Sequence, residues 1–137
     1  MKGLEKYNAK TIVAWGEAIS GNKEFHKILY ELDYPELGYF VYALKNNKEA
    51  RKWLTDNKFF HLVALIQGAE GKKEALDWLE KHEFIVLKHM AMAIDGDGAS
   101  LNFFRDNDKL IYVLTTKMKA VKDEIEDNNQ DPHKISF

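Results

Sequence analysis

The 137-residue sequence contains no cysteine. Disulfides, iron–sulfur clusters, thiolate zinc sites and cysteine nucleophiles are therefore excluded. Long apolar runs are absent as well, since none approaches the ~18 residues that a membrane-spanning helix needs. Half of the first residues, Met1–Lys6, are charged, and this segment lacks the apolar stretch of a signal peptide. We therefore expect a cytoplasmic location and no membrane as a partner.

The charges show no excess of one sign. There are 20 basic and 22 acidic residues, mixed along the chain, which gives a formal net charge of −2. Nucleic-acid-binding surfaces neutralise phosphates with clustered lysine and arginine, and no such stripe is present. Nucleic acid is therefore not an expected partner. With 45% hydrophobic and 12% aromatic residues, the composition predicts a packed core and not a disordered chain.

Sequence motifs for catalysis and cofactor binding are also missing. The serines are Ser20, Ser100 and Ser136, and none lies in Gly-x-Ser-x-Gly or follows a phosphate-binding glycine loop. The segment 95–100 resembles the beginning of a calcium loop, but Ala99 stands where an oxygen ligand is required. We therefore predict no catalytic residue, no metal site and no cofactor, and we expect the protein not to be an enzyme.

One sequence pattern occurs twice. Residues 48–54, Lys-Glu-Ala-Arg-Lys-Trp-Leu, return 25 positions later at 73–79 as Lys-Glu-Ala-Leu-Asp-Trp-Leu. Over the 25 positions from 45 to 69, seven residues are identical to those in 70–94. A fixed period of this size is the signature of a tandem-repeat fold.

Apolar residues recur at fixed places in every 25-residue row. Their spacings of three, four and seven residues predict two amphipathic helices per row, of about ten and about twelve residues. The apolar column of the first helix holds Leu4, Leu29, Leu54, Leu79 and Phe104. The columns of the second helix hold Ile12, Leu37, Leu62, Leu87 and Tyr112, followed by Trp15, Phe40, Leu65, Met90 and Thr115. Trp53 and Trp78 occupy a further column of the first helix, where core packing is favoured over ligand stacking.

The junctions between these helices have residues suited to helix ends. Gly and Asn readily adopt the left-handed conformation that ends a helix, and one column holds Gly21, Asn46, Gly71 and Gly96. Between the two helices of a row, Asp33 precedes Pro35 and is predicted to cap the second helix. The same column contains Asn8 and Asp108, which predicts the same capping role there.

Together these patterns predict an all-α fold. We expect an α-solenoid of stacked antiparallel helix hairpins, with five repeats of 25 residues, an incomplete first repeat and about nine or ten helices. The repeat domain would span 1–127 and end in one long helix at about Asp127. Lys117, Lys119 and Lys122 would give that helix a polar outer face that stops the stack. Residues 128–137 are predicted to form a polar, poorly ordered tail.

The helix-turn-helix units, with small residues in the second helix and Gly or Asn at each exit, resemble the α-solenoid class that includes tetratricopeptide, HEAT and Sel1-like repeats. Those families have longer units of roughly 34 to 45 residues. The Lys-Glu-Ala-x-x-Trp-Leu motif is more similar to short αα repeats found in tandem in uncharacterised bacterial proteins. This resemblance covers residues 3–121 and implies a fold but no activity.

A candidate binding surface lies in the positions that vary between repeats, because each repeat can present its own side chain there. Variable positions of the second helix carry aromatic and methionine side chains, which suit protein recognition. The candidates are Tyr39, Tyr42, Phe60, His61, His89 and Met92. The leading hypothesis is a non-catalytic scaffold that binds a protein or peptide on these residues. Burial between the layers of the solenoid is the alternative for the same side chains.

Two further functions remain open. The first is a small enzyme or metal-dependent protein built around His61, His82 and His89, if stacking of the repeats brings these histidines together. The second is self-association as a homo-oligomer, because an incomplete first repeat would leave Leu4, Ile12 and Trp15 only partly covered.

Overall fold

The computed structural model describes residues 2–130, and side chains through 128. Within this range the chain forms nine α-helices and no strand, so the predicted all-α helical repeat fold is confirmed. The helices are α1 (Ala9–Ile19), α2 (Lys23–Glu31), α3 (Pro35–Leu44), α4 (Lys48–Asp56), α5 (Phe60–Ala69), α6 (Lys73–Lys81), α7 (Ile85–Ile94), α8 (Gly98–Asn107) and α9 (Lys109–Gln130). Of the predicted tail, 128–130 belong to α9, and 131–137 lie outside the described residues.

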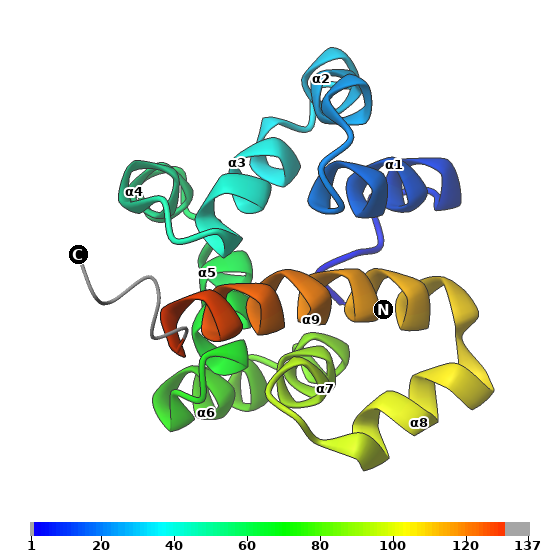
Figure 1. The fold of residues 1–137 in the computed structure, drawn as a ribbon, viewed down its shortest axis with the longest axis vertical. Coiled ribbons are helices and arrows are strands. Elements are labelled where there is room, and N and C mark those ends of the chain that lie inside the picture. Colours follow the sequence, from blue (N-terminus) through cyan, green and yellow to red (C-terminus); the bar gives the residue numbers. More distant parts are fainter. Residues whose placement is uncertain (1, 131–137) are drawn as a thin grey trace.

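The helix positions follow the 25-residue period of the sequence. The first helices of successive repeats begin at Lys23, Lys48 and Lys73, and the second helices at Pro35, Phe60 and Ile85. Each α2, α4, α6 or α8 packs against the helix before it and the helix after it. Figure 1 shows α1 to α8 as an arc, with the even-numbered helices on its outside. None of the helices in residues 2–130 combines the length and apolar character that crossing a membrane requires.

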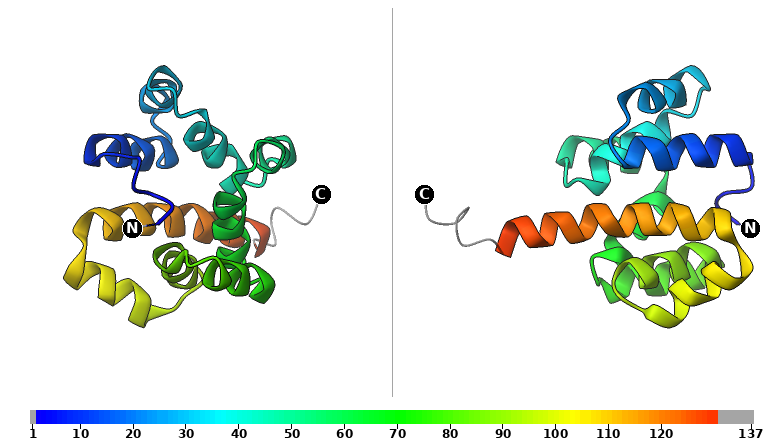
Figure 2. Two further views of the ribbon diagram at one scale, coloured as in Figure 1. Left: turned by 180° about the vertical axis from the view of Figure 1, so that it is seen from behind. Right: turned by 45° about the vertical axis from the view of Figure 1, so that its right-hand side comes forward.

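The last helix, α9, does not cap the outside of the stack. It runs through the middle of the arc (Figures 1 and 2) and contacts α1, α3, α7 and α8. Part of its apolar side is buried in the core, at Ile111, Leu114 and Met118. The expectation of a polar outer face at this position is therefore wrong. Because α9 keeps a core stripe over its first turns, it returns to the first repeat and packs along α1.

The segment before α1 has no helix, as expected for an incomplete first repeat. It nevertheless covers apolar surface: Leu4, Ile12 and Trp15 are 2%, 5% and 0% exposed. The prediction that these residues are only partly covered is wrong, because the N-terminal segment and α9 bury them. The basis of the self-association hypothesis is thereby removed.

Residues with a left-handed backbone conformation end the helices, both between successive repeats and between the two helices of a repeat. Gly21, Asn46, Gly71 and Gly96 have φ values of 102°, 72°, 90° and 113°, which confirms their predicted role. Asp33 has φ 64° and ends α2, while Tyr34 is the N-cap residue of α3. The predicted capping role of Asp33 is therefore wrong, because this residue is needed for the preceding turn. Asn8 and Asp108 do cap, accepting hydrogen bonds from the amides of Thr11 and Ile111.

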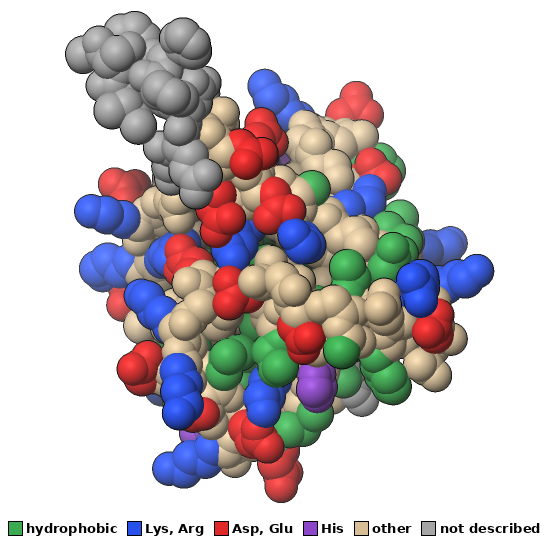
Figure 3. Space-filling model, turned by 60° about the horizontal axis from the view of Figure 1, so that its bottom comes forward, with side chains coloured by type: hydrophobic (Ala, Val, Ile, Leu, Met, Phe, Trp, Pro, Cys, Tyr) green, Lys and Arg blue, Asp and Glu red, His purple; other side chains and the backbone are tan. Residues whose placement is uncertain are grey.

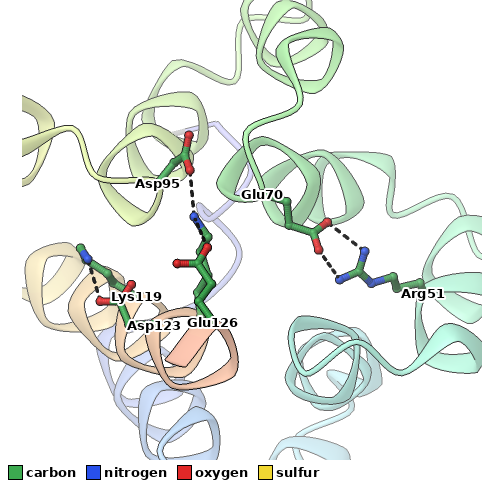
Figure 4. Close-up of polar contacts among 7 residues, drawn as sticks. Arg51, Glu70, Asp95, Lys119, Asp123 and Glu126 are labelled. Atoms are coloured by element: carbon green, nitrogen blue, oxygen red, sulfur yellow. Dashed lines mark hydrogen bonds and ion pairs between the residues drawn. The ribbon is translucent and has the colours of Figure 1, made fainter. Parts of the chain in front are cut away.

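Ion pairs connect the ends of the inner helices (Figure 4). The guanidinium of Arg51 donates two hydrogen bonds to the carboxylate of Glu70, at 3.0 and 3.1 Å, and one to the carbonyl of Ala43. It thereby joins the C-terminal ends of α3 and α5. On α9, Lys122 lies 2.8 Å from the carboxylate of Asp95, directly after α7. This pair connects α9 to the C-terminal end of α7.

Candidate functional site

The six candidate residues lie on α3, α5 and α7 and differ in exposure. Tyr42 and Phe60 are 48% and 47% exposed, and His89 is also exposed. Tyr39, His61 and Met92 are half-buried. The side chains fall into three local groups, and their role in binding a partner stays a prediction.

The two tyrosines of α3 pack against neighbouring helices. The ring of Tyr39 is stacked on Trp53 of α4, with 4.0 Å between ring centroids and 10° between ring planes. Its edge lies against Tyr30 of α2. The ring of Tyr42 is tilted against His26, with 4.6 Å between centroids. One face of Tyr39 is therefore already used within the chain, whereas Tyr42 keeps about half of its surface free.

At the start of α5, His61 packs beside the N-terminal segment while Phe60 remains exposed. The imidazole of His61 is stacked on Phe84, with 5.2 Å between centroids and 10° between planes. Burial lowers the pKa of His61 from its ordinary value, and the positive charge of Lys6 lowers it further. His61 therefore belongs to the packing between α5 and α7, and its neutral form is favoured.

His89 of α7 lines an open groove between α7 and α8 with a volume of about 550 Å³. The groove is mainly apolar and is lined by Ile85, Val86, His89, Ser100, Phe103 and Phe104, among others. Ile85 and Phe103 are 44% and 61% exposed, and Phe104 is buried. Figure 3, which brings the side of α6 to α8 forward, shows hydrophobic side chains gathered next to a histidine.

The aromatic stacking of the earlier repeats does not continue at Phe103. Trp53 and Trp78 are half-buried and lie parallel to Phe59 and Phe84, with centroids 5.9 and 5.7 Å apart. Phe103 occupies the equivalent position in the next row. There the sequence places Lys109 where the stacking phenylalanine would be. Phe103 has no parallel ring among the described residues, and its ring lies at 70° to that of Phe104.

A hydrogen-bonded chain forms the polar wall of the groove. Ser100 Oγ donates to Asp97 Oδ2 at 2.7 Å, and His89 Nδ1 lies 3.3 Å from the same Oγ. Asp97 also caps α8 by accepting from the amide of Ala99. A nucleophilic serine donates its proton to a histidine, whereas Ser100 donates to the carboxylate. This order of donors is that of a structural network around a helix N-terminus.

The three histidines of the metal hypothesis have separate partners. His61 stacks on Phe84, His82 packs on Trp78 with 4.3 Å between centroids, and His89 contacts Ser100. Among the described residues, no three His, Cys, Asp or Glu side chains are grouped so that they could hold a metal ion. The juxtaposition on which the hypothesis depended is therefore not found in this part of the chain.

A second polar cluster holds the N-terminal segment against α3. Glu36 is 2% exposed, accepts a hydrogen bond from the Tyr7 hydroxyl at 2.7 Å and pairs with Lys6 at 2.8 Å. Burial raises the pKa of Tyr7, and the hydrogen bond to Glu36 raises it further. The ammonium of Lys6 also lies over the rings of Tyr7, Tyr34 and Phe59. Because every buried polar group here has a partner, the cluster is explained by structural roles.

Sequence reasoning named His89 but missed Phe103 and Ser100 beside it. The signal was present: Phe103 shares a column with Trp53 and Trp78. Whether a ring in this column is covered or exposed depends on whether the next aromatic position of the row also carries a ring.

No protein-family model matches this chain, and no match was found among curated proteins or solved structures.

Proposed function

We propose that the protein is a non-catalytic interaction module that binds a protein or peptide partner in the groove between α7 and α8. The observation that carries the proposal is the open apolar groove beside His89, where the repeat leaves Phe103 61% exposed. Large apolar side chains exposed together, next to a polar rim, mark interaction sites.

The dimensions and chemistry of the groove support a peptide-sized contact. Its volume of about 550 Å³ lies within the ~300–1,000 Å³ typical of binding pockets. Ile85 and Phe103 provide apolar contact area, and the His89 ring provides a polar group. These side chains stand on α7 and α8, so binding requires little ordering of the protein, which favours affinity.

The proposal is tested by selecting binders from a random peptide display library against the immobilised wild-type protein. Enriched peptides are then tested for binding to the Phe103→Ala variant. The matched control is Tyr42→Ala, which removes an exposed aromatic ring from α3. We expect binding to be lost in Phe103→Ala and retained in Tyr42→Ala, with unchanged circular dichroism melts for both variants.

Two other outcomes would place the binding surface elsewhere or contradict the interaction function. Peptides lost with Tyr42→Ala but not Phe103→Ala would move the binding surface to α3. Failure to enrich any specific binder from libraries that yield binders to a control domain would contradict the interaction function itself.

A further inference from the structure

We propose that residues 2–6 form a strap that lies closed over the start of α5 and α7 at neutral pH and opens when His61 becomes charged. The strap lies outside the α7–α8 groove, so this switch is independent of the proposed function. It depends on how the strap is attached, on what it covers and on the charges around His61.

The strap is attached at both ends by the ammonium groups of exposed lysines. Near α3, Lys6 Nζ lies 2.8 Å from the carboxylate of Glu36. At the other end, Lys2 Nζ donates a hydrogen bond of 2.6 Å to the carbonyl oxygen of His82, at the end of α6. The strap therefore connects the second repeat to the turn that precedes α7.

Between these two attachments the strap covers apolar side chains at the start of α7. Gly3 packs so closely there that an added Cβ would lie 2.8 Å from Leu87 Cδ1 and 3.2 Å from Phe84 Cδ1. Within the strap only Leu4 has a buried apolar side chain. A non-helical segment with so few buried contacts opens locally at lower cost than the packed helices. Opening would uncover Leu87, which is 0% exposed in the closed state.

Tyr7 keeps the strap tethered when it opens. Its ring is buried and lies 5.0 Å from the ring of Tyr34 between centroids. Its hydroxyl donates to the carboxylate of Glu36, so this buried group retains a hydrogen bond after Lys6 has left. The opening motion is therefore confined to residues 2–6.

His61 lies beside the strap among charges of both signs. It shares an open pocket of about 290 Å³ with Lys2, Glu5 and Lys6 of the strap, and Glu36 of α3 is a further charge near the imidazole. These two lysines and two carboxylates balance while the imidazole is neutral. A proton on His61 then adds an uncompensated positive charge in a half-buried place, which is unfavourable.

The closed strap disfavours the charged imidazole in two ways. Burial lowers the pKa of His61, and the positive charge of Lys6 lowers it further, while the attraction of Glu36 and Glu5 opposes these effects without outweighing them. Opening moves Lys6 away and admits water, which relieves both causes. The open state therefore binds a proton more readily than the closed state, and the open fraction rises as the pH falls below the ordinary histidine value of 6.5.

The test is NMR hydrogen exchange on the full-length ¹⁵N-labelled protein at pH 7 and pH 5, with each rate divided by the intrinsic rate at that pH. The amide of Tyr7 reports on the strap, because it donates to the carbonyl oxygen of Leu4 at 3.1 Å in the closed state. Its protection should fall at least about threefold from pH 7 to pH 5. At both pH values it should stay at least about tenfold below that of the Leu65 amide in α5, as expected for local opening.

Two histidine variants identify the responsible proton. His61→Phe keeps a ring on Phe84 and should remove the fall in Tyr7 protection. His26→Phe is the matched control, because burial also lowers the pKa of His26, but its imidazole packs on Tyr30 and Tyr42. This control should retain the wild-type fall, and circular dichroism melts verify that both variants are folded.

Three outcomes would overturn the proposal. The first is unchanged Tyr7 protection at pH 5 in the wild type, and the second is a fall of wild-type size in His61→Phe. The third is a Tyr7 amide protected as strongly as that of Leu65, because the strap would then open only when the whole fold unfolds.

Discussion

The rings of Tyr39 and Trp53 lie 4.0 Å apart between centroids and 10° from parallel. The ring of Phe59 is also nearly parallel to the Trp53 indole, with 5.9 Å between centroids. Among the described residues, Phe103 in the same column has no such parallel ring. One repeat position thus contributes packing in one row and an exposed surface in another.

Replacing Trp53 should therefore cost more stability than replacing Phe103. Trp53→Ala removes a half-buried indole and both of its stacking contacts, so we expect a loss of about 2–4 kcal/mol in the free energy of unfolding. Phe103→Ala removes a mostly exposed ring and should cost less than about 1 kcal/mol. Urea denaturation of the two variants measures both values. Equal losses would mean that Phe103 packs as Trp53 does.

Two glycines offer a matched test of close helix packing. A Cβ at Gly68 would lie 2.9 Å from Leu76 Cδ2 and 3.0 Å from Ala91 Cβ, whereas one at Gly98 would meet nothing within 4 Å. Gly68→Ala should cost about 1–3 kcal/mol by overpacking. Gly98→Ala, in the first turn of α8, should stabilise by about 0.4–1 kcal/mol. Thermal melts with opposite shifts are expected, and a stabilised Gly68→Ala would show that the neighbouring helices yield easily.

Acid should weaken the fold through two histidines. Burial lowers the pKa of His26 and of His61 below the ordinary value of 6.5. At a pH just below 6.5 the unfolded chain therefore binds more protons than the folded one, and stability falls as the pH drops. We expect lower urea midpoints at pH 5 than at pH 7. The difference should shrink in His61→Phe, which keeps a ring on Phe84, while an unchanged difference in that variant would exclude His61 as a cause.

Alkali should weaken the fold through tyrosine ionisation. Burial raises the pKa of Tyr30 from 10.0 to about 12, and the pKa of Tyr7 is also raised. The unfolded chain then loses these protons first as the pH rises above 10, so stability is present below pH 10 and is lost progressively above it. Urea denaturation between pH 9 and 11 measures this loss. Tyr30→Phe should reduce the pH dependence, and a variant with the full wild-type slope would contradict the assignment.

The helices could be predicted from the sequence because helix formation depends on residues that are close together in the chain. The 25-residue recurrence of leucine and of Gly or Asn at the exits predicted both helices of each row after the incomplete first one, and Leu29, Leu54 and Leu79 are fully buried. Asp33 was assigned to the wrong helix end, because the same residue type suits a cap and a left-handed turn. The choice between these depends on how the preceding helix ends.

The position of α9 could not be predicted from the sequence in the same way. Its lysines indicated a polar surface, but Lys117 and Lys122 reach Glu17 and Asp95 across the fold, at 3.2 and 2.8 Å. Those partners are 100 and 27 residues away in the sequence, so no local pattern predicts them.

The candidate site was predictable only in part, for a related reason. Variation between repeats selected His89, which lines the groove, but it also selected Tyr39, whose ring is stacked within the repeat. Whether a residue that varies between repeats is free to contact a partner or packs against its own chain depends on the neighbouring aromatic ring in the same row. Comparing that following position, Phe59 and Phe84 against Lys109, would have indicated that Phe103 lacks a parallel ring.

The most direct test of the account is calorimetric titration of one display-selected peptide into wild-type protein, Phe103→Ala and Tyr42→Ala, each verified as folded. We predict at least about tenfold weaker binding to Phe103→Ala, as for loss of an aromatic contact worth more than ~1.4 kcal/mol, and wild-type affinity for Tyr42→Ala. Equal affinity of wild type and Phe103→Ala would contradict the claim that the α7–α8 groove is the binding surface.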